Sequence, residues 1–69
     1  MVEVFTTNVE QQTQAVMLEE LLSVHFPLFK INFDIDDCDR ILRVEGKLVL
    51  PEKIMEVLHA KGYHCRILE

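Results

Sequence analysis

Apolar and polar residues alternate along four short segments of this chain, which is the period of a β-strand with one buried face. The second segment alternates most regularly, with Ile31, Phe33 and Ile35 on one side and polar residues between them. The turn-favouring acidic run after it predicts a hairpin with the third segment, whose buried side carries Leu42 and Val44. The four predicted strands occupy residues 2–6, 30–36, 41–45 and 64–68.

The first and last strands alternate less regularly. In the first strand Val2 and Val4 share one side, so Phe5 falls on the other and we expect it to face away from the core. In the last strand the alternation predicts that Cys65 and Ile67 point inward.

Between the strands, the apolar period changes to the three- and four-residue steps of amphipathic helices. The first helix is expected to start at a capping box, either Thr7-x-x-Glu10 or Asn8-x-x-Gln11, and to end before Pro27. Its apolar stripe comprises Ala15, Leu18, Leu21, Leu22 and His25.

The second helix is expected to start at Pro51, since proline is favoured at the first helical position. Gly62 suits the left-handed position just past its end. The stripe on its buried face comprises Ile54, Val57, Leu58 and the stem of Lys61.

The order strand, helix, strand, strand, helix, strand predicts an α+β fold of the ferredoxin-like βαββαβ type. In this fold a four-stranded antiparallel sheet is covered on one face by two helices. The 69 residues are too few for a second domain, so we expect one domain over residues 1–69.

Four short motifs in the second half of the chain are typical of a known family: Ile31-Asn32-Phe33-Asp34, Leu42-Arg43-Val44-Glu45-Gly46, Pro51-Glu52-Lys53-Ile54 and Lys61-Gly62-Tyr63. With them the chain resembles the heavy-metal-associated (HMA) domains of small copper and zinc chaperones and of metal-transporting ATPases. The resemblance covers roughly residues 30–68, and the first strand and helix fit by length and order.

The family binds its metal through a Met-x-Cys-x-x-Cys motif on the loop between the first strand and the first helix. Here the equivalent stretch, Thr6 to Gln12, contains no cysteine, histidine or methionine. Soft ions such as copper(I) select thiolate and thioether ligands, so the resemblance implies a degenerate HMA-like member with no metal or other cofactor at this loop. An alternative is a metal-binding module that uses unconventional ligands from His64, Cys65 or Cys38.

Net charge and motif content limit the remaining function classes. Twelve acidic and seven basic side chains give a formal charge of −5, which opposes binding to nucleic acid or to an anionic membrane. The opening residues lack a secretory signal, and two cysteines are too few for a disulfide-held secreted domain, so we expect a cytoplasmic protein with reduced thiols. No catalytic grouping can be assembled from the motifs, so we expect no enzymatic activity.

Three apolar side chains remain on the outward register of the predicted strands, namely Phe5, Ile41 and Leu68. Contiguous apolar area with a charged border is typical of a protein contact surface. We therefore expect a protein-interaction or self-association module, which binds a protein partner or forms a homodimer through the open sheet face.

Overall fold

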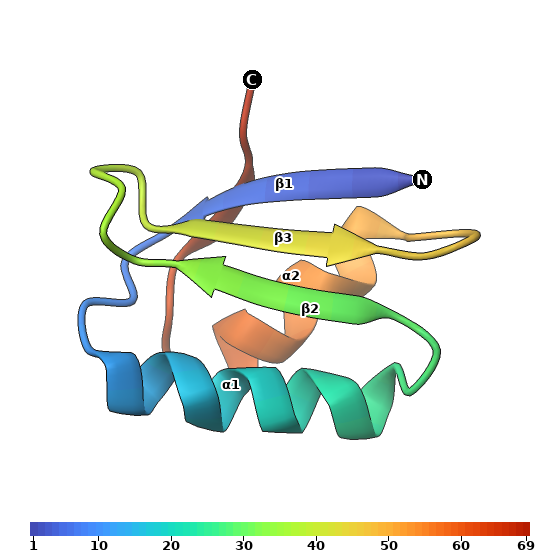
Figure 1. The fold of residues 1–69 in the computed structure, drawn as a ribbon, viewed down its shortest axis with the longest axis horizontal. Coiled ribbons are helices and arrows are strands. Elements are labelled where there is room, and N and C mark those ends of the chain that lie inside the picture. Colours follow the sequence, from blue (N-terminus) through green and yellow to red (C-terminus); the bar gives the residue numbers. More distant parts are fainter.

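The computed structural model describes all 69 residues, and the six elements follow one another in the predicted order (Figure 1). The strands and helices alternate as two βαβ units. Their bounds are β1 Val2–Thr7, α1 Gln12–His25, β2 Lys30–Asp34, β3 Ile41–Glu45, α2 Pro51–Ala60 and β4 Cys65–Ile67.

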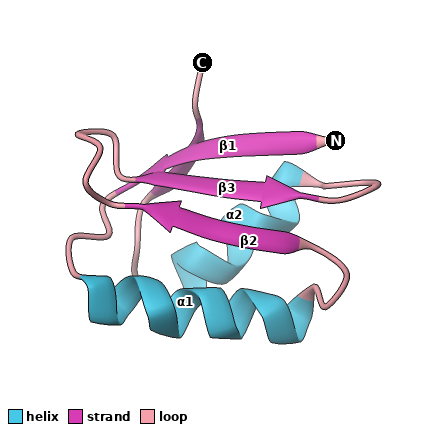
Figure 2. Ribbon diagram, viewed as in Figure 1, coloured by secondary structure: helices cyan, strands magenta, loops and turns pink.

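The four strands form one antiparallel sheet in the order β2-β3-β1-β4, with β2 and β4 at its edges. Both helices lie on the same face of this sheet, and the opposite face is open (Figure 2). This arrangement confirms the predicted ferredoxin-like fold. Neither helix is long and apolar enough to cross a bilayer.

Helix α1 begins later than predicted. Its N-cap is Gln11, whose side chain forms a capping box with Gln14, so the two predicted boxes that start at Thr7 and Asn8 are wrong. Thr7 is the last residue of β1, and its hydroxyl donates to the carbonyl oxygen of Arg40 at 2.7 Å. The hydroxyl is therefore used in a long-range contact and not in a cap.

Helix α2 begins and ends as predicted. Pro51 occupies the first turn, and Gly62 follows the helix with a φ of +88°, a conformation that favours glycine. Ile54 and Leu58 face the sheet and are fully buried.

The main core lies between the sheet and the two helices, and Phe5 is one of its members. The cluster draws on both helices and on three strands: Phe5, Leu22, Leu42, Val44, Val49, Ile54, Leu58 and Cys65. Phe5 has no exposed surface, so the prediction that it faces outward is wrong.

The strand register gives the physical reason. Phe5 lies opposite Leu42 on β3 and Ile67 on β4, and directly opposed residues of antiparallel strands point to the same face. Turning Val2 and Val4 inward instead would leave the ring exposed on a central strand. Because burial gains free energy in proportion to apolar area, the larger side chain takes the core side.

The β2–β3 turn is tied to the end of β1 by backbone and side-chain hydrogen bonds. Arg40 adopts a left-handed φ of +50°, and its guanidinium donates to the carbonyl oxygen of Ile35 at 3.1 Å. The hydroxyls of Thr6 and Thr7 donate to the carbonyl oxygens of Asp39 and Arg40, each at 2.7 Å. These contacts hold the turn beside the loop that follows β1.

We expect Phe5→Ala to lower the free energy of unfolding by about 3–5 kcal/mol, because it opens a cavity in the centre of the core. Val2→Ala is the control, since half of the Val2 side chain is exposed, and its cost should stay within about 0.5 kcal/mol. Urea unfolding followed by circular dichroism measures both. If the alanine variant does not fold, Phe5→Leu replaces it, with an expected loss of about 1 kcal/mol or more. Equal losses at positions 5 and 2 would contradict the observed register.

Candidate functional site

The loop between β1 and α1 lies where the HMA resemblance places the metal motif, and its side chains are engaged in structural hydrogen bonds. The Thr7 hydroxyl accepts from the Val9 amide at 3.2 Å in addition to its bond to Arg40. The side-chain oxygen of Asn8 accepts from the backbone amide of His64 at 2.9 Å. Three loops are thereby joined at one end of the sheet by neutral oxygen groups, which are poor ligands for a soft ion.

Cys65 lies at the start of β4 and points into the core. Its side chain is 1 % exposed, and burial raises the pKa of its thiol to about 12. The thiolate is the form that binds metals and attacks electrophiles. At neutral pH the Cys65 side chain therefore behaves as a small apolar core residue.

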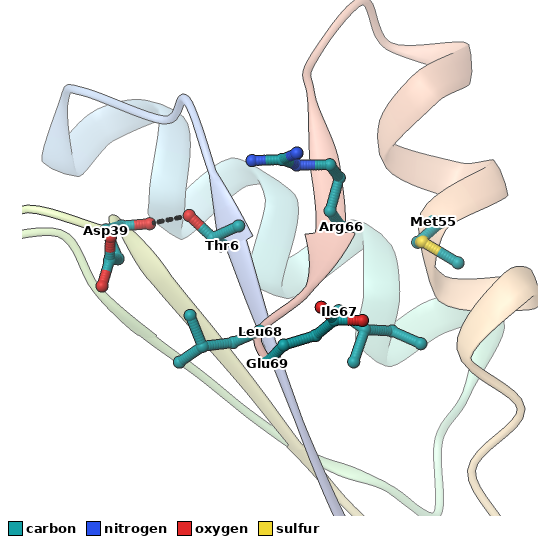
Figure 3. Close-up of a pocket in the computed structure, with 7 residues that line it drawn as sticks. All are labelled: Thr6, Asp39, Met55, Arg66, Ile67, Leu68 and Glu69. Atoms are coloured by element: carbon teal, nitrogen blue, oxygen red, sulfur yellow. Dashed lines mark hydrogen bonds between the residues drawn. The ribbon is translucent and has the colours of Figure 1, made fainter.

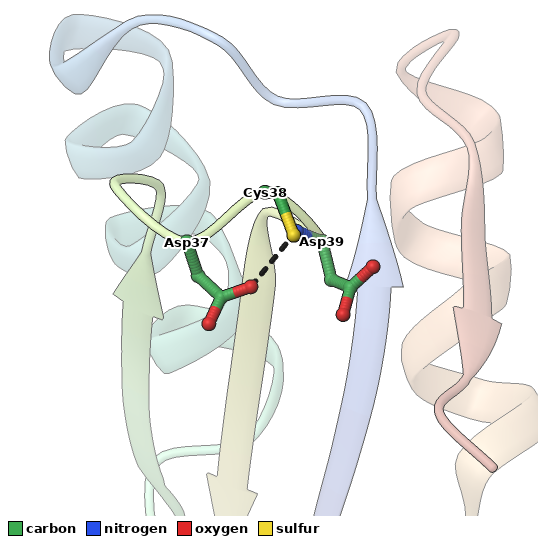
Figure 4. A group of neighbouring side chains, drawn as sticks. All are labelled: Asp37, Cys38 and Asp39. Atoms are coloured by element: carbon green, nitrogen blue, oxygen red, sulfur yellow. Dashed lines mark hydrogen bonds between the residues drawn. The ribbon is translucent and has the colours of Figure 1, made fainter.

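Cys38 is exposed at the tip of the β2–β3 turn, between two aspartates (Figure 4). The ligand atoms of Asp37, Cys38 and Asp39 lie within 4.8 Å of one another, and no other three histidine, cysteine or acidic residues come as close together. The alternative metal set of His64, Cys65 and Cys38 is therefore not assembled.

The close approach of Asp37, Cys38 and Asp39 follows from the conformation of the turn itself. An oxygen of the Asp37 carboxylate accepts from the Asp39 backbone amide at 2.9 Å, as in an Asx turn. All three side chains are exposed, so water solvates the two carboxylates. The cluster consists of consecutive residues of one turn, and no other element supplies a ligand to it.

A shallow hollow beside β4 contains two histidines, His59 and His64. His59 Nε2 lies 3.2 Å from the carbonyl oxygen of Cys65, and a protonated Nε2 donates to it. This contact was not predicted, because the helical period of α2 indicates only that His59 faces away from the buried stripe. The imidazole is directed at a backbone group, so the contact joins α2 to the outer edge of β4.

His25 was predicted at the edge of the α1 stripe, near the end of the helix. Its side chain is exposed, and its ring centroid lies 6.1 Å from that of Phe26. The contact is local and structural.

The open sheet face carries an apolar patch that differs from the predicted one. We use the name open-face patch for Val2, Val4, Ile41 and Leu68. The register places Val4 and Val2 on the same face as Ile41, and the Leu68 amide donates to the Val4 carbonyl oxygen at 2.9 Å. Ile41 and Leu68 therefore belong to this face as predicted, whereas Phe5 does not.

The open-face patch continues into a hollow where the chain leaves β4 (Figure 3). Apolar atoms from Met55, Ile67 and Leu68 line it beside the charged side chains of Arg66 and Glu69. This face was misassigned from the sequence because two valines lie on one side of β1 and a single phenylalanine on the other, although the single larger side chain is the buried one.

Comparisons with family models, with curated proteins and with solved structures found no match to this chain. The resemblance to HMA domains therefore stays a prediction from the sequence motifs.

We expect iodoacetamide to modify one thiol of the native chain and two thiols of the unfolded chain. Cys38 is exposed, whereas the buried Cys65 thiol resists both access and ionisation. Intact-mass spectrometry counts the adducts. The control Cys38→Ser should take up no label until denaturant is added, and rapid labelling of that folded variant would show that Cys65 is accessible.

Stability should fall as the pH rises from about 9 toward 12. The pKa of Cys65 rises from 9.0 to about 12 on folding, so above pH 9 the unfolded chain releases a proton that the folded chain keeps. The expected contribution to this fall is about 1.4 kcal/mol per pH unit within the window, with none below it. Urea unfolding of the wild type and of Cys65→Val on either side of pH 9.0 isolates this contribution, since valine cannot ionise. Parallel pH dependences for the two proteins would contradict the burial of the thiol.

Proposed function

We propose that this protein is a non-enzymatic protein-interaction domain, similar in fold to HMA domains but without their metal chemistry, whose open sheet face binds a partner protein. The observation that supports the proposal is the open-face patch. Val2 is 50 % exposed and Leu68 40 % exposed, and both adjoin Val4, whereas Ile41, which lies opposite Thr6, is buried. A contiguous apolar surface of this kind is typical of a contact site, whereas single exposed apolar residues are ordinary.

The charges around the open-face patch indicate the chemistry of the partner. The strand register places three basic residues, Lys30, Arg43 and Arg66, and two acidic residues, Asp34 and Glu45, on this face. These strand residues give a small basic excess on a chain whose net charge is −5, and the hollow at the β4 end of the face adds the acidic residues Asp39 and Glu69. Two copies would present the same basic strand residues to each other, so the better match is a partner with an apolar centre and acidic residues opposite the strands.

The HMA resemblance supports a binding role over a metal-carrying role. Thr7 and Asn8 stand in the loop where the family has its cysteines, and both side chains hold other loops in place. Because the polar groups of this loop form such hydrogen bonds, we infer that the loop stabilises the fold. The surface left for function is the one on the other side of the sheet from the helices.

The double variant Val2→Glu with Leu68→Glu should lose at least tenfold in affinity for the partner, since it adds two negative charges to an apolar contact that meets an acidic border. Affinity capture from a cell extract with immobilised wild type identifies the partner, and calorimetry with the purified partner then measures the affinity of each variant. The matched control is Met17→Glu with Val24→Glu, which adds the same charge to exposed apolar positions of α1.

Three results would contradict the proposal. They are capture of no protein by the wild type, equal affinity of the double variant, and a larger loss for the α1 control than for the open-face variant. Circular dichroism must show that all variants are folded. Binding should also weaken with added salt if the charged border contributes as argued.

A further inference from the structure

The outer edge of β2 has no hydrogen-bond partner within the chain. β2 is an edge strand that pairs only with β3. Apart from that ladder, none of the remaining backbone or side-chain hydrogen bonds of the molecule involves residues 30–34. A row of free N–H and C=O groups on a strand edge is a template for pairing with another strand.

The opposite edge of the sheet differs. β4 has only three residues, and the His59 side chain contacts the Cys65 carbonyl oxygen there. A short edge strand that is partly covered by a side chain is a protected edge. β2 is longer, and it contains no proline, glycine or bulge that would block pairing.

The sequence of β2 is complementary to itself in one antiparallel register. In Lys-Ile-Asn-Phe-Asp, a twofold axis at Asn32 places Lys30 of one copy opposite Asp34 of the other, and Ile31 opposite Phe33. Every residue of the strand is paired, and both ends form opposite-charge pairs. Cross-strand pairs of opposite charge and of large apolar groups each stabilise a sheet by roughly 0.2–1 kcal/mol.

We propose that two copies of this chain associate through their β2 edges, antiparallel about Asn32, to form one continuous sheet. This goes beyond the interaction of the open face, which uses other side chains. Lys30 and Asp34 lie on the open face in each copy, so they meet on the same side of the joined sheet. Ile31 and Phe33 meet on the face that the helices cover.

The apolar residues of β2 support the proposal, because they are less buried than their neighbours. Ile31 and Phe33 are only half-buried, whereas Leu42 and Val44 beside them on β3 have no exposed surface. Beneath β2 lies α1. Its residues Leu21 and His25 line a hollow together with α2, so Val16, which is 44 % exposed and lies on the other side of the helix from His25, is turned away from α2. A second copy at this edge would cover apolar area that the chain leaves partly in water.

Glu19 stands next to Val16 on the same flank of α1 and would approach its counterpart in the second copy. This like-charge pair opposes the association and limits its strength. We therefore expect a weak, reversible dimer that depends on the two Lys30–Asp34 pairs.

The joined sheet would place both open-face patches on the same side. A twofold axis perpendicular to the sheet keeps the helices of both copies on one face and leaves the other face open. A dimer could then bind two sites on one partner, which raises the overall affinity without any new contact.

A charge-reversal experiment tests the proposal on the full chain by sedimentation equilibrium from micromolar to millimolar concentration. Wild type should form a dimer, and Lys30→Asp or Asp34→Lys alone should shift it to monomer, because each places like charges opposite one another. The double variant Lys30→Asp with Asp34→Lys should dimerise again. A mixture of the two single variants should also associate, since each supplies the charges that the other needs.

Crosslinking gives a second readout. Asn32→Cys in a Cys38→Ser background should form an intermolecular disulfide, since directly paired strand residues have Cα atoms about 4.5–5.5 Å apart. A wild type that is monomeric at every concentration would overturn the proposal. So would a dimer that survives both single charge reversals, or one that the open-face variant Val2→Glu with Leu68→Glu abolishes. A monomeric wild type, or a dimer that survives both charge reversals, does not bear on whether the open face binds another protein, so the two proposals fail separately.

Discussion

Phe5 sits where the sheet meets both helices, in the middle of the strand that holds the sheet together. β1 is hydrogen-bonded to β3 on one side and to β4 on the other, so the orientation of its side chains sets the orientation of both neighbours. A shift of one residue would exchange the two faces of every strand in register with it. With the ring inside, Leu42 and Cys65 are also inside, and the valines of β1 are left on the open face. The composition of the open face is thus a consequence of where one aromatic ring is buried.

The same constraint acts on the loops at one end of the sheet. Once β1 is placed, its last residues lie beside the β2–β3 turn, and the hydroxyl of Thr7 reaches the Arg40 carbonyl oxygen. Asn8 then meets the backbone of His64. These bonds lie in the loop where the resemblance to HMA domains would place thiolates. A neutral oxygen that accepts a backbone amide stabilises the loop in the absence of any ion, and this is the physical difference between this loop and a metal loop.

The local pattern of apolar and polar residues was sufficient to predict most of the fold, but it did not predict which residues of β1 form the open-face patch. The alternation of Ile31 and Phe33 and the helical spacing of Ile54 and Leu58 depend on neighbours a few residues away, and both were predicted correctly. The orientation of β1 could not be obtained in this way, because both of its faces carry apolar residues and only packing against distant elements decides between them. The start of α1 was misplaced for a similar reason. Thr7 has the side chain of a cap, but its bond partner lies 33 residues further along the chain.

Charge limits the ways in which the free edge of β2 can pair with another strand. A net charge of −5 keeps copies apart in most orientations, which disfavours nonspecific stacking of edges. At β2, however, a basic residue and an acidic residue stand at opposite ends of the strand, so the antiparallel register centred on Asn32 brings attraction to both ends. Slipping the register by two residues removes both Lys30–Asp34 pairs and leaves at least one charge in each copy opposite the neutral Asn32. Lys30 and Asp34 therefore disfavour other pairings of the β2 edge and favour the antiparallel register centred on Asn32. Charged residues on natural edge strands confer specificity in the same way.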